Sequence, residues 1–172
     1  MTEGQRSHLD FKNDSAEVDI LRRWLAGLEH DRGTRATLRR CRSPGEVELM
    51  PEFHRLWWQI KPLATKAYPQ SLAAVVGLVS QLKADTGPKI TLAAQMGRPL
   101  DRDRATLSGL RFRRLLAITE RDDLYTAMTR VLRHLDGQAN LADLAQGVYG
   151  WNDYVRKQWA YAYYEVAPNK EA

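Results

Sequence analysis

The chain has 172 residues, of which 44% are hydrophobic; this excludes a disordered protein and allows one domain or two small helical bundles. No apolar run approaches the roughly 18 residues of a membrane span, and the polar N-terminus lacks a secretory signal, so we expect a cytoplasmic protein without a membrane partner. The formal net charge of +5 does not indicate a fold, but it favours polyanionic partners.

Proline, glycine and capping residues divide the chain into segments of helical periodicity, and no run alternates with the period of a strand. We therefore predict an all-α protein. The polar residues 1–14 read as a flexible N-terminal extension. The first helix spans about 15–29, where apolar residues recur at spacings of three and four. Gly33 then opens a short basic turn over 34–42.

Proline marks the starts of the next helices. Ser43 can cap a helix with Pro44 at its first position and Glu46 three residues after the cap. A second helix begins at Pro51. The third, about 69–84, is strongly apolar, so we predict that it is the most buried element of the N-terminal half.

Residues 85–88 contain glycine and proline, and we predict there a boundary between two helical bundles, 15–88 and 89–167, with about eight helices in all. A short helix over 91–96 precedes a polar stretch over 97–104. The remaining predicted helices are 107–119, 122–135, 140–149 and 152–166, and a polar tail, 168–172, follows.

Arginine outnumbers lysine 19 to 7, and its planar fork of donors suits phosphate oxygens better than the compact ammonium of lysine. A GC-rich genome, which raises the arginine content of every protein, is the alternative explanation. Basic residues gather in the first half, in the middle of the second half and in the last helix. The candidate nucleic-acid-binding residues are Arg32, Arg35, Arg39, Arg40, Arg111, Arg113, Arg114, Arg121, Arg130, Arg133, Arg156 and Lys157.

Helical spacing separates four of these arginines from the apolar faces of their helices. Arg111 and Arg114 lie three residues apart, on a different face from Phe112. In the next helix Arg130 and Arg133 project from the side opposite the apolar stripe. Two neighbouring helices thus each present a pair of arginines. A solvated face that binds nothing is the alternative for either helix alone.

Aromatic residues add a second candidate contact, because exposed Trp or Tyr side chains can stack on single-stranded bases. Trp57 and Trp58 are adjacent and cannot both face one core, so one of them is a candidate interface residue. Trp57 and Trp159 lie on apolar stripes and are expected in the core. Cys41 has no second cysteine with which to form a disulfide, and we interpret it as an ordinary free thiol.

Residue patterns of enzymes are missing from the sequence. We find no phosphate-cradling glycine-rich loop with lysine, no paired histidines at metal-ligand spacing and no Ser-His-Asp arrangement, and so expect no catalysis, metal or cofactor. One alternative is a ribonuclease of the HEPN type, since Arg23 and His30 fit its loose spacing. A second alternative is a helix-turn-helix regulator, with 146–154 as its nearest match, and a third is an adaptor that binds only protein.

Several segments in order resemble a known family. A basic run and a capped turn lie in residues 39–46, and a Pro-x-Phe helix lies in 51–56. Two further segments follow: Arg-Phe-Arg-Arg-Leu-Leu at 111–116 and Arg-Val-Leu-Arg-His-Leu at 130–135. The chain is similar, from about Glu17 to Val166, to the small (CasB) subunit of the type I-E CRISPR surveillance complex called Cascade. It departs from that family at Leu92, after which we would expect a glycine.

The resemblance implies a non-catalytic protein of two helical bundles that acts in antiviral defence. Its expected partners are the guide RNA, the target DNA including the displaced strand, the backbone and large subunits of Cascade, and a second copy of itself arranged head to tail. It would stabilise the R-loop. Because base pairing with the guide reads the sequence, such a subunit needs arginines directed at the nucleic-acid backbone.

Overall fold

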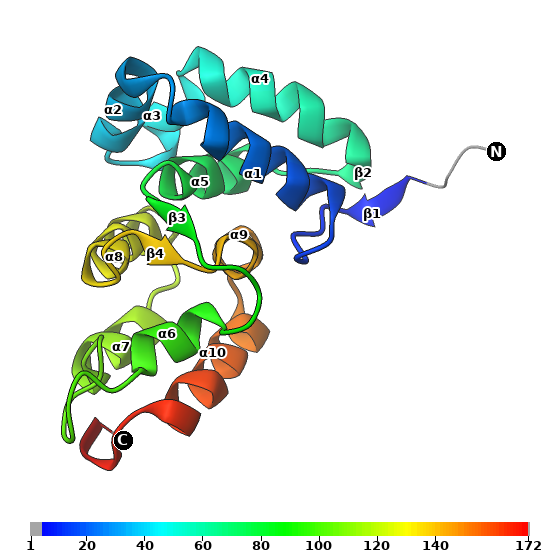
Figure 1. Ribbon diagram of the computed structural model, residues 1–172. Coiled ribbons are helices and arrows are strands. Elements are labelled where there is room, and N and C mark those ends of the chain that lie inside the picture. Colours follow the sequence, from blue (N-terminus) through cyan, green and yellow to red (C-terminus); the bar gives the residue numbers. More distant parts are fainter. Residues whose placement is uncertain (1–4, 172) are drawn as a thin grey trace.

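The computed structural model describes residues 5–171 and confirms the all-α class (Figure 1). Its ten α-helices are α1 (Ala16–Leu28), α2 (Arg32–Arg40), α3 (Pro44–Glu48), α4 (Pro51–Ile60), α5 (Pro69–Val79), α6 (Leu92–Gly97), α7 (Gly109–Leu116), α8 (Arg121–His134), α9 (Leu141–Tyr149) and α10 (Asp153–Val166). Two 3₁₀ turns, η1 (Lys61–Leu63) and η2 (Asn169–Glu171), and four strands of two or three residues complete the described part.

Helix starts follow the capping residues. The side chains of Ser15, Ser43, Thr91, Ser108, Asn140 and Asn152 each accept a hydrogen bond from a backbone N–H in the first turn of the helix that follows. Pro44, Pro51 and Pro69 occupy first helical positions, as predicted. Most of the α-helices therefore begin where a cap or a proline accounts for their unpaired donors, whereas α8 begins after Glu120, which makes no side-chain cap hydrogen bond.

The predicted turn over 34–42 is wrong, because most of that segment is the helix α2. Asp31 caps it: its carboxylate accepts hydrogen bonds from Thr34 N at 3.1 Å and from the Thr34 hydroxyl at 2.7 Å. Gly33, which we interpreted as a turn residue, lies inside the first turn, where a cap this strong offsets its low helix propensity.

Helix α5 lies at the centre of the molecule. Nine consecutive residues, 71–79, are buried, as expected for a helix that is apolar on all sides. It packs against α1, α3 and α4 on one side and against α8 and α9 on the other (Figure 1). Buried residues from both halves form one continuous hydrophobic cluster. The division into bundles at residue 88 remains a prediction.

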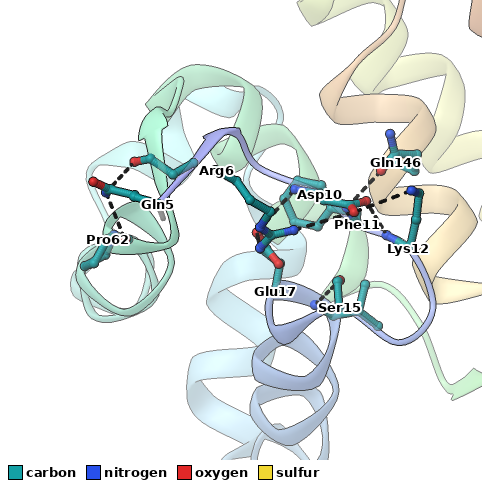
Figure 2. A network of polar contacts seen from close by, with 11 residues as sticks. Gln5, Arg6, Asp10, Phe11, Lys12, Ser15, Glu17, Pro62 and Gln146 are labelled. Atoms are coloured by element: carbon teal, nitrogen blue, oxygen red, sulfur yellow. Dashed lines mark hydrogen bonds and ion pairs between the residues drawn. The ribbon is translucent and has the colours of Figure 1, made fainter. Parts of the chain in front are cut away.

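Residues 5–14 differ from the predicted flexible extension, because they fold onto the rest of the chain (Figure 2). Strand β1 (Arg6–His8) pairs in parallel with β2 (Ala64–Lys66). Leu9 and Phe11 are buried, and the Phe11 N–H donates to Gln146 Oε1 of α9 at 2.8 Å. Two apolar anchors thus order a segment whose average composition is polar. The rest of the predicted extension, residues 1–4, lies outside the described residues.

A second parallel pair, β3 (Ala84–Asp85) with β4 (Gln138–Ala139), joins the segment after α5 to the segment before α9. Asp85 anchors this junction. Its carboxylate accepts hydrogen bonds from Arg22 Nε at 2.7 Å, Gly87 N at 2.9 Å and Leu141 N at 3.1 Å. Burial alone would raise the pKa of Asp85, but these hydrogen bonds outweigh burial and hold that pKa below its usual range.

We expect Asp85→Asn to lower the free energy of unfolding by about 1–3 kcal/mol at pH 7, since hydrogen bonds to a charged group are lost. The folded-state pKa of Asp85 lies below the unfolded value of about 3.9, so its ionic contribution is present above that pH and is lost as the pH falls through the folded-state pKa. Urea unfolding should therefore show a smaller difference between the two proteins at low pH. Asp14→Asn, at an exposed position, is the control, and a pH-independent difference for Asp85→Asn would contradict the assignment.

Candidate nucleic-acid interface

Helix α7 places a basic face beside a buried one. The Ser108 hydroxyl accepts a hydrogen bond from Arg111 N at 3.3 Å and starts the helix. The ring of Phe112 is fully buried, whereas Arg111 and Arg114 are exposed. Phe112 stacks on Tyr163 of α10, with ring centroids 3.8 Å apart and planes inclined by 7°. This aromatic contact fixes the rotation of α7 and therefore the direction in which its arginines face.

Helix α8 has the same division. Leu124, Met128 and Val131 are buried along one side, and Arg130 and Arg133 are exposed. Just after the helix, Asp136 and Gly137 adopt positive φ angles of 53° and 69°, which end it close to the predicted limit at residue 135.

The two basic faces meet in one groove of about 800 Å³, here called the α7/α8 groove. It is lined by Leu107, Arg111, Arg114, Leu115, Ile118, Asp123, Thr126, Ala127, Arg130, Val131, Arg133 and His134. This groove is lined by all four of the arginines that helical spacing separated from the apolar faces of their helices. With His134 neutral, four arginines against one aspartate give the lining a formal charge of +3.

Most of this charge is uncompensated. Arg111 Nη1 lies 2.9 Å from His134 Nε2, which is a hydrogen bond and not an ion pair. Within residues 5–171, Arg114, Arg130 and Arg133 have neither a hydrogen-bond nor an ion-pair partner. Guanidinium groups left unpaired around an open hollow can bind phosphate oxygens without first breaking an internal contact.

Other predicted contacts in the first half serve the fold. Arg39 Nε donates to the carbonyl of Ser80 at 3.3 Å, and Arg35 donates to the carbonyl of Leu82. Both carbonyls follow the C-terminal end of α5, where unpaired carbonyls carry partial negative charge. Burial, and then the neighbouring charge of Arg35, lower the pKa of Arg39. These two arginines hold α2 against α5.

Three more arginines of the predicted set also have intramolecular partners. Arg121 donates to Ser71 Oγ at 2.9 Å and to Gln70 Oε1 at 3.2 Å, which ties α8 to the start of α5. Arg113 donates to the carbonyl of Glu171 at 3.3 Å, and Arg156 donates to the carbonyl of Leu116 at 3.4 Å.

Lys157 forms an ion pair with Asp153 at 3.0 Å, where Arg156 lies 3.7 Å from the same carboxylate. By contrast, Arg32 and Arg40 are exposed on α2 and have no partner among the described residues. The structure thus brings four of the twelve candidates together in the groove and uses six elsewhere within the molecule.

Two residues of the alternative functions, Gln146 and Arg23, form hydrogen bonds within the fold. Gln146, in the helix-turn-helix match, accepts the Phe11 N–H and is not free to read a base. In the HEPN-type pair, Arg23 donates to the carbonyl of Asp19 at 3.4 Å, and His30 is exposed beyond the end of α1. Across residues 5–171, no three His, Cys, Asp or Glu side chains are grouped to hold a metal ion. No helix in the same range is long and apolar enough to span a membrane.

Comparison with known proteins adds two findings. The family model for CRISPR-associated protein Cse2 matches residues 34–164, about three quarters of the chain. A chain in the crystal structure of Escherichia coli Cascade bound to a PAM-containing double-stranded DNA target has a similar fold. The TM-score is 0.65 at 21% sequence identity, and the alignment covers 90% of this chain and 97% of that one. No curated protein matches the chain by sequence.

Proposed function

Because the chain belongs to the Cse2 family of CRISPR-associated proteins, we propose that it is a non-catalytic small subunit of a type I-E Cascade complex. In this role it binds the nucleic-acid backbone through the α7/α8 groove and stabilises the R-loop. The observation that carries the proposal is the convergence of Arg111, Arg114, Arg130 and Arg133 on one groove where three of them have no intramolecular partner.

The chemistry of the groove fits a backbone contact better than the reading of bases. Its polar lining is dominated by arginine, which forms bidentate contacts with phosphate, and it offers no asparagine or glutamine to pair with adenine. A complex that finds its target by base pairing with a guide RNA needs sequence-independent contacts of this kind. The displaced single strand and the strands of the guide–target path are the proposed ligands.

The structurally similar chain comes from a Cascade complex bound to double-stranded DNA. By analogy we assign the same setting here: guide RNA, target DNA, the backbone and large subunits, and a second copy of this chain arranged head to tail, all in the cytoplasm. A sequence-specific regulator is the competing function. It would bind one operator duplex in preference to unrelated duplexes, whereas the proposed subunit would bind unrelated sequences alike.

Purification from the native host tests the proposal. We expect the affinity-tagged protein to copurify with several other proteins and with a short RNA of uniform length, because a Cascade subunit is held in a guide-loaded assembly. Mass spectrometry identifies the proteins, and denaturing electrophoresis measures the RNA. The tag expressed alone is the control. Recovery of an isolated monomer free of RNA would contradict the proposed function.

A further inference from the structure

Helix α4 exposes a tryptophan on the side of the molecule away from the groove. The neighbouring rings differ: Trp57 is half-buried and stacks on Phe53 at 6.3 Å between centroids, whereas Trp58 is 64% exposed. Helix α5 lies between α4 and α8 in Figure 1, so this surface is separate from the α7/α8 groove. The fold therefore uses Trp57 for packing and leaves most of the Trp58 ring in solvent.

A lysine accompanies the exposed ring. Lys61 Nζ lies 5.1 Å from the ring centroid of Trp58 and 5.8 Å from that of Trp57, within the range of a cation–π contact. Lys61 and Lys66 are both exposed, and neither has an ion-pair partner among the described residues. One cation can cover only one face of a ring, and the exposure of Trp58 leaves room for a second planar group.

The carboxylates near this surface lie beside Arg55, one turn away from Trp58. Glu52 pairs with Arg55 at 3.6 Å, and Asp31 is close enough to interact with it electrostatically. Arg55 is thus partly neutralised, and the positive charge found beside the indole comes from Lys61. An aromatic plane next to unpaired cations is the combination that binds single-stranded nucleic acid, where bases stack and phosphates need counter-charges.

Two other well-exposed aromatic residues lack this combination. Tyr154 and Tyr161 of α10 are 69% and 78% exposed, but the neighbouring Lys157 is paired with Asp153. Both lysine–aromatic contacts found in the described range belong to Lys61. Tyr161 is therefore a matched control: an exposed ring on a helix surface without a free cation beside it.

We propose that Trp58 stacks on one unpaired base of a single-stranded nucleic acid while Lys61 contacts an adjacent phosphate. Every base has a π-face, so the contact is insensitive to sequence. The inference rests on the proposed function only in taking nucleic acid as the ligand, since it concerns a second surface. Nucleic acid is the proposed occupant because the exposed indole and the lysine beside it supply the stacking surface and the counter-charge that a base and its phosphate need.

Binding of the full-length protein to a fluorescent oligothymidylate of about 15 nucleotides, a length within the usual span of single-strand sites, tests the proposal. Trp58→Ala should weaken binding roughly 5- to 150-fold, the range found when a stacking side chain is removed. Trp58→Phe should retain most of the affinity because it keeps a π-face. Lys61→Ala should reduce the slope of log affinity against log salt by about 0.7, because one phosphate contact is lost. Tyr161→Ala should bind like the unaltered protein.

Circular dichroism verifies folding, which truncation of so exposed a ring should leave intact. Unchanged affinity in Trp58→Ala, or no measurable binding of the oligonucleotide by the unaltered protein, would overturn the inference. So would a variant that binds the oligonucleotide normally yet fails to copurify with other subunits, since Trp58 would then be a protein contact. A variant with alanine at the four groove arginines separates the two proposals. If it binds the oligonucleotide normally and Trp58→Ala does not, the groove proposal fails and the Trp58 proposal stands.

Discussion

Replacing Phe112 with alanine should lower the free energy of unfolding by about 3–5 kcal/mol, one of the largest effects of any single substitution in this chain. The ring is fully buried, stacks on Tyr163 and meets the edge of Tyr164 at 5.9 Å between centroids. Truncation removes these contacts and leaves a cavity that the surrounding helices fill only in part. Chemical denaturation followed by circular dichroism measures the change.

Leu110→Ala is the matched control, because it shortens an apolar side chain on the same helix at a position that is 51% exposed. We expect it to change the free energy of unfolding by no more than about 0.5 kcal/mol. Similar losses at both positions would mean that α7 does not dock through Phe112. The orientation of Arg111 and Arg114 would then need another cause.

Apart from α2, the helices of this chain were predictable to within a few residues because their signals are local. Ser43 with Pro44, and Asn140 before α9, satisfy backbone donors within one turn, so sequence neighbours suffice to place the start. The failure at α2 has the same local origin. The interpretation of Gly33 as the start of a turn overlooked Asp31, whose side chain caps the helix two residues earlier.

The N-terminal segment shows where local reasoning ends. Residues 1–14 are polar on average, and average composition predicts flexibility. Leu9 and Phe11 are nevertheless buried, because β2 offers a strand edge and α9 offers Gln146 to accept the Phe11 N–H. These partners lie tens of residues away in sequence, and no signal within the segment identifies them.

The same limit applies to the candidate site. Helical spacing predicted that Arg111 and Arg114 oppose Phe112, and both arginines are exposed as expected. It could not tell them from Arg35 and Arg39, whose guanidinium groups bond to carbonyls just after α5. Arginines held by the fold and arginines free to bind look alike in a composition count. Only the packing of the helices that carry them separates the two.

A variant with alanine at Arg111, Arg114, Arg130 and Arg133 should lose affinity for the target and for the displaced strand on every sequence alike. Each phosphate contact releases condensed counterions, so log affinity falls with log salt by roughly 0.7 to 0.9 per contact. Removing four contacts should therefore flatten the slope by about three per protein copy. This slope is obtained by measuring the R-loop lifetime at several salt concentrations, for complexes assembled with the unaltered protein and for complexes assembled with the variant.

Folding should survive the four changes, because these side chains are exposed and alanine is the best helix former. The matched control removes four exposed cations outside the groove, Arg23, Lys89, Arg98 and Arg102. If the groove is the contact, this control lowers the net charge equally but keeps most of the slope, since unbound cations act only through screened long-range attraction. Equal flattening in both variants would show that net charge, and not the α7/α8 groove, holds the nucleic acid; Arg32 and Arg40 on α2 would then be the next residues to replace.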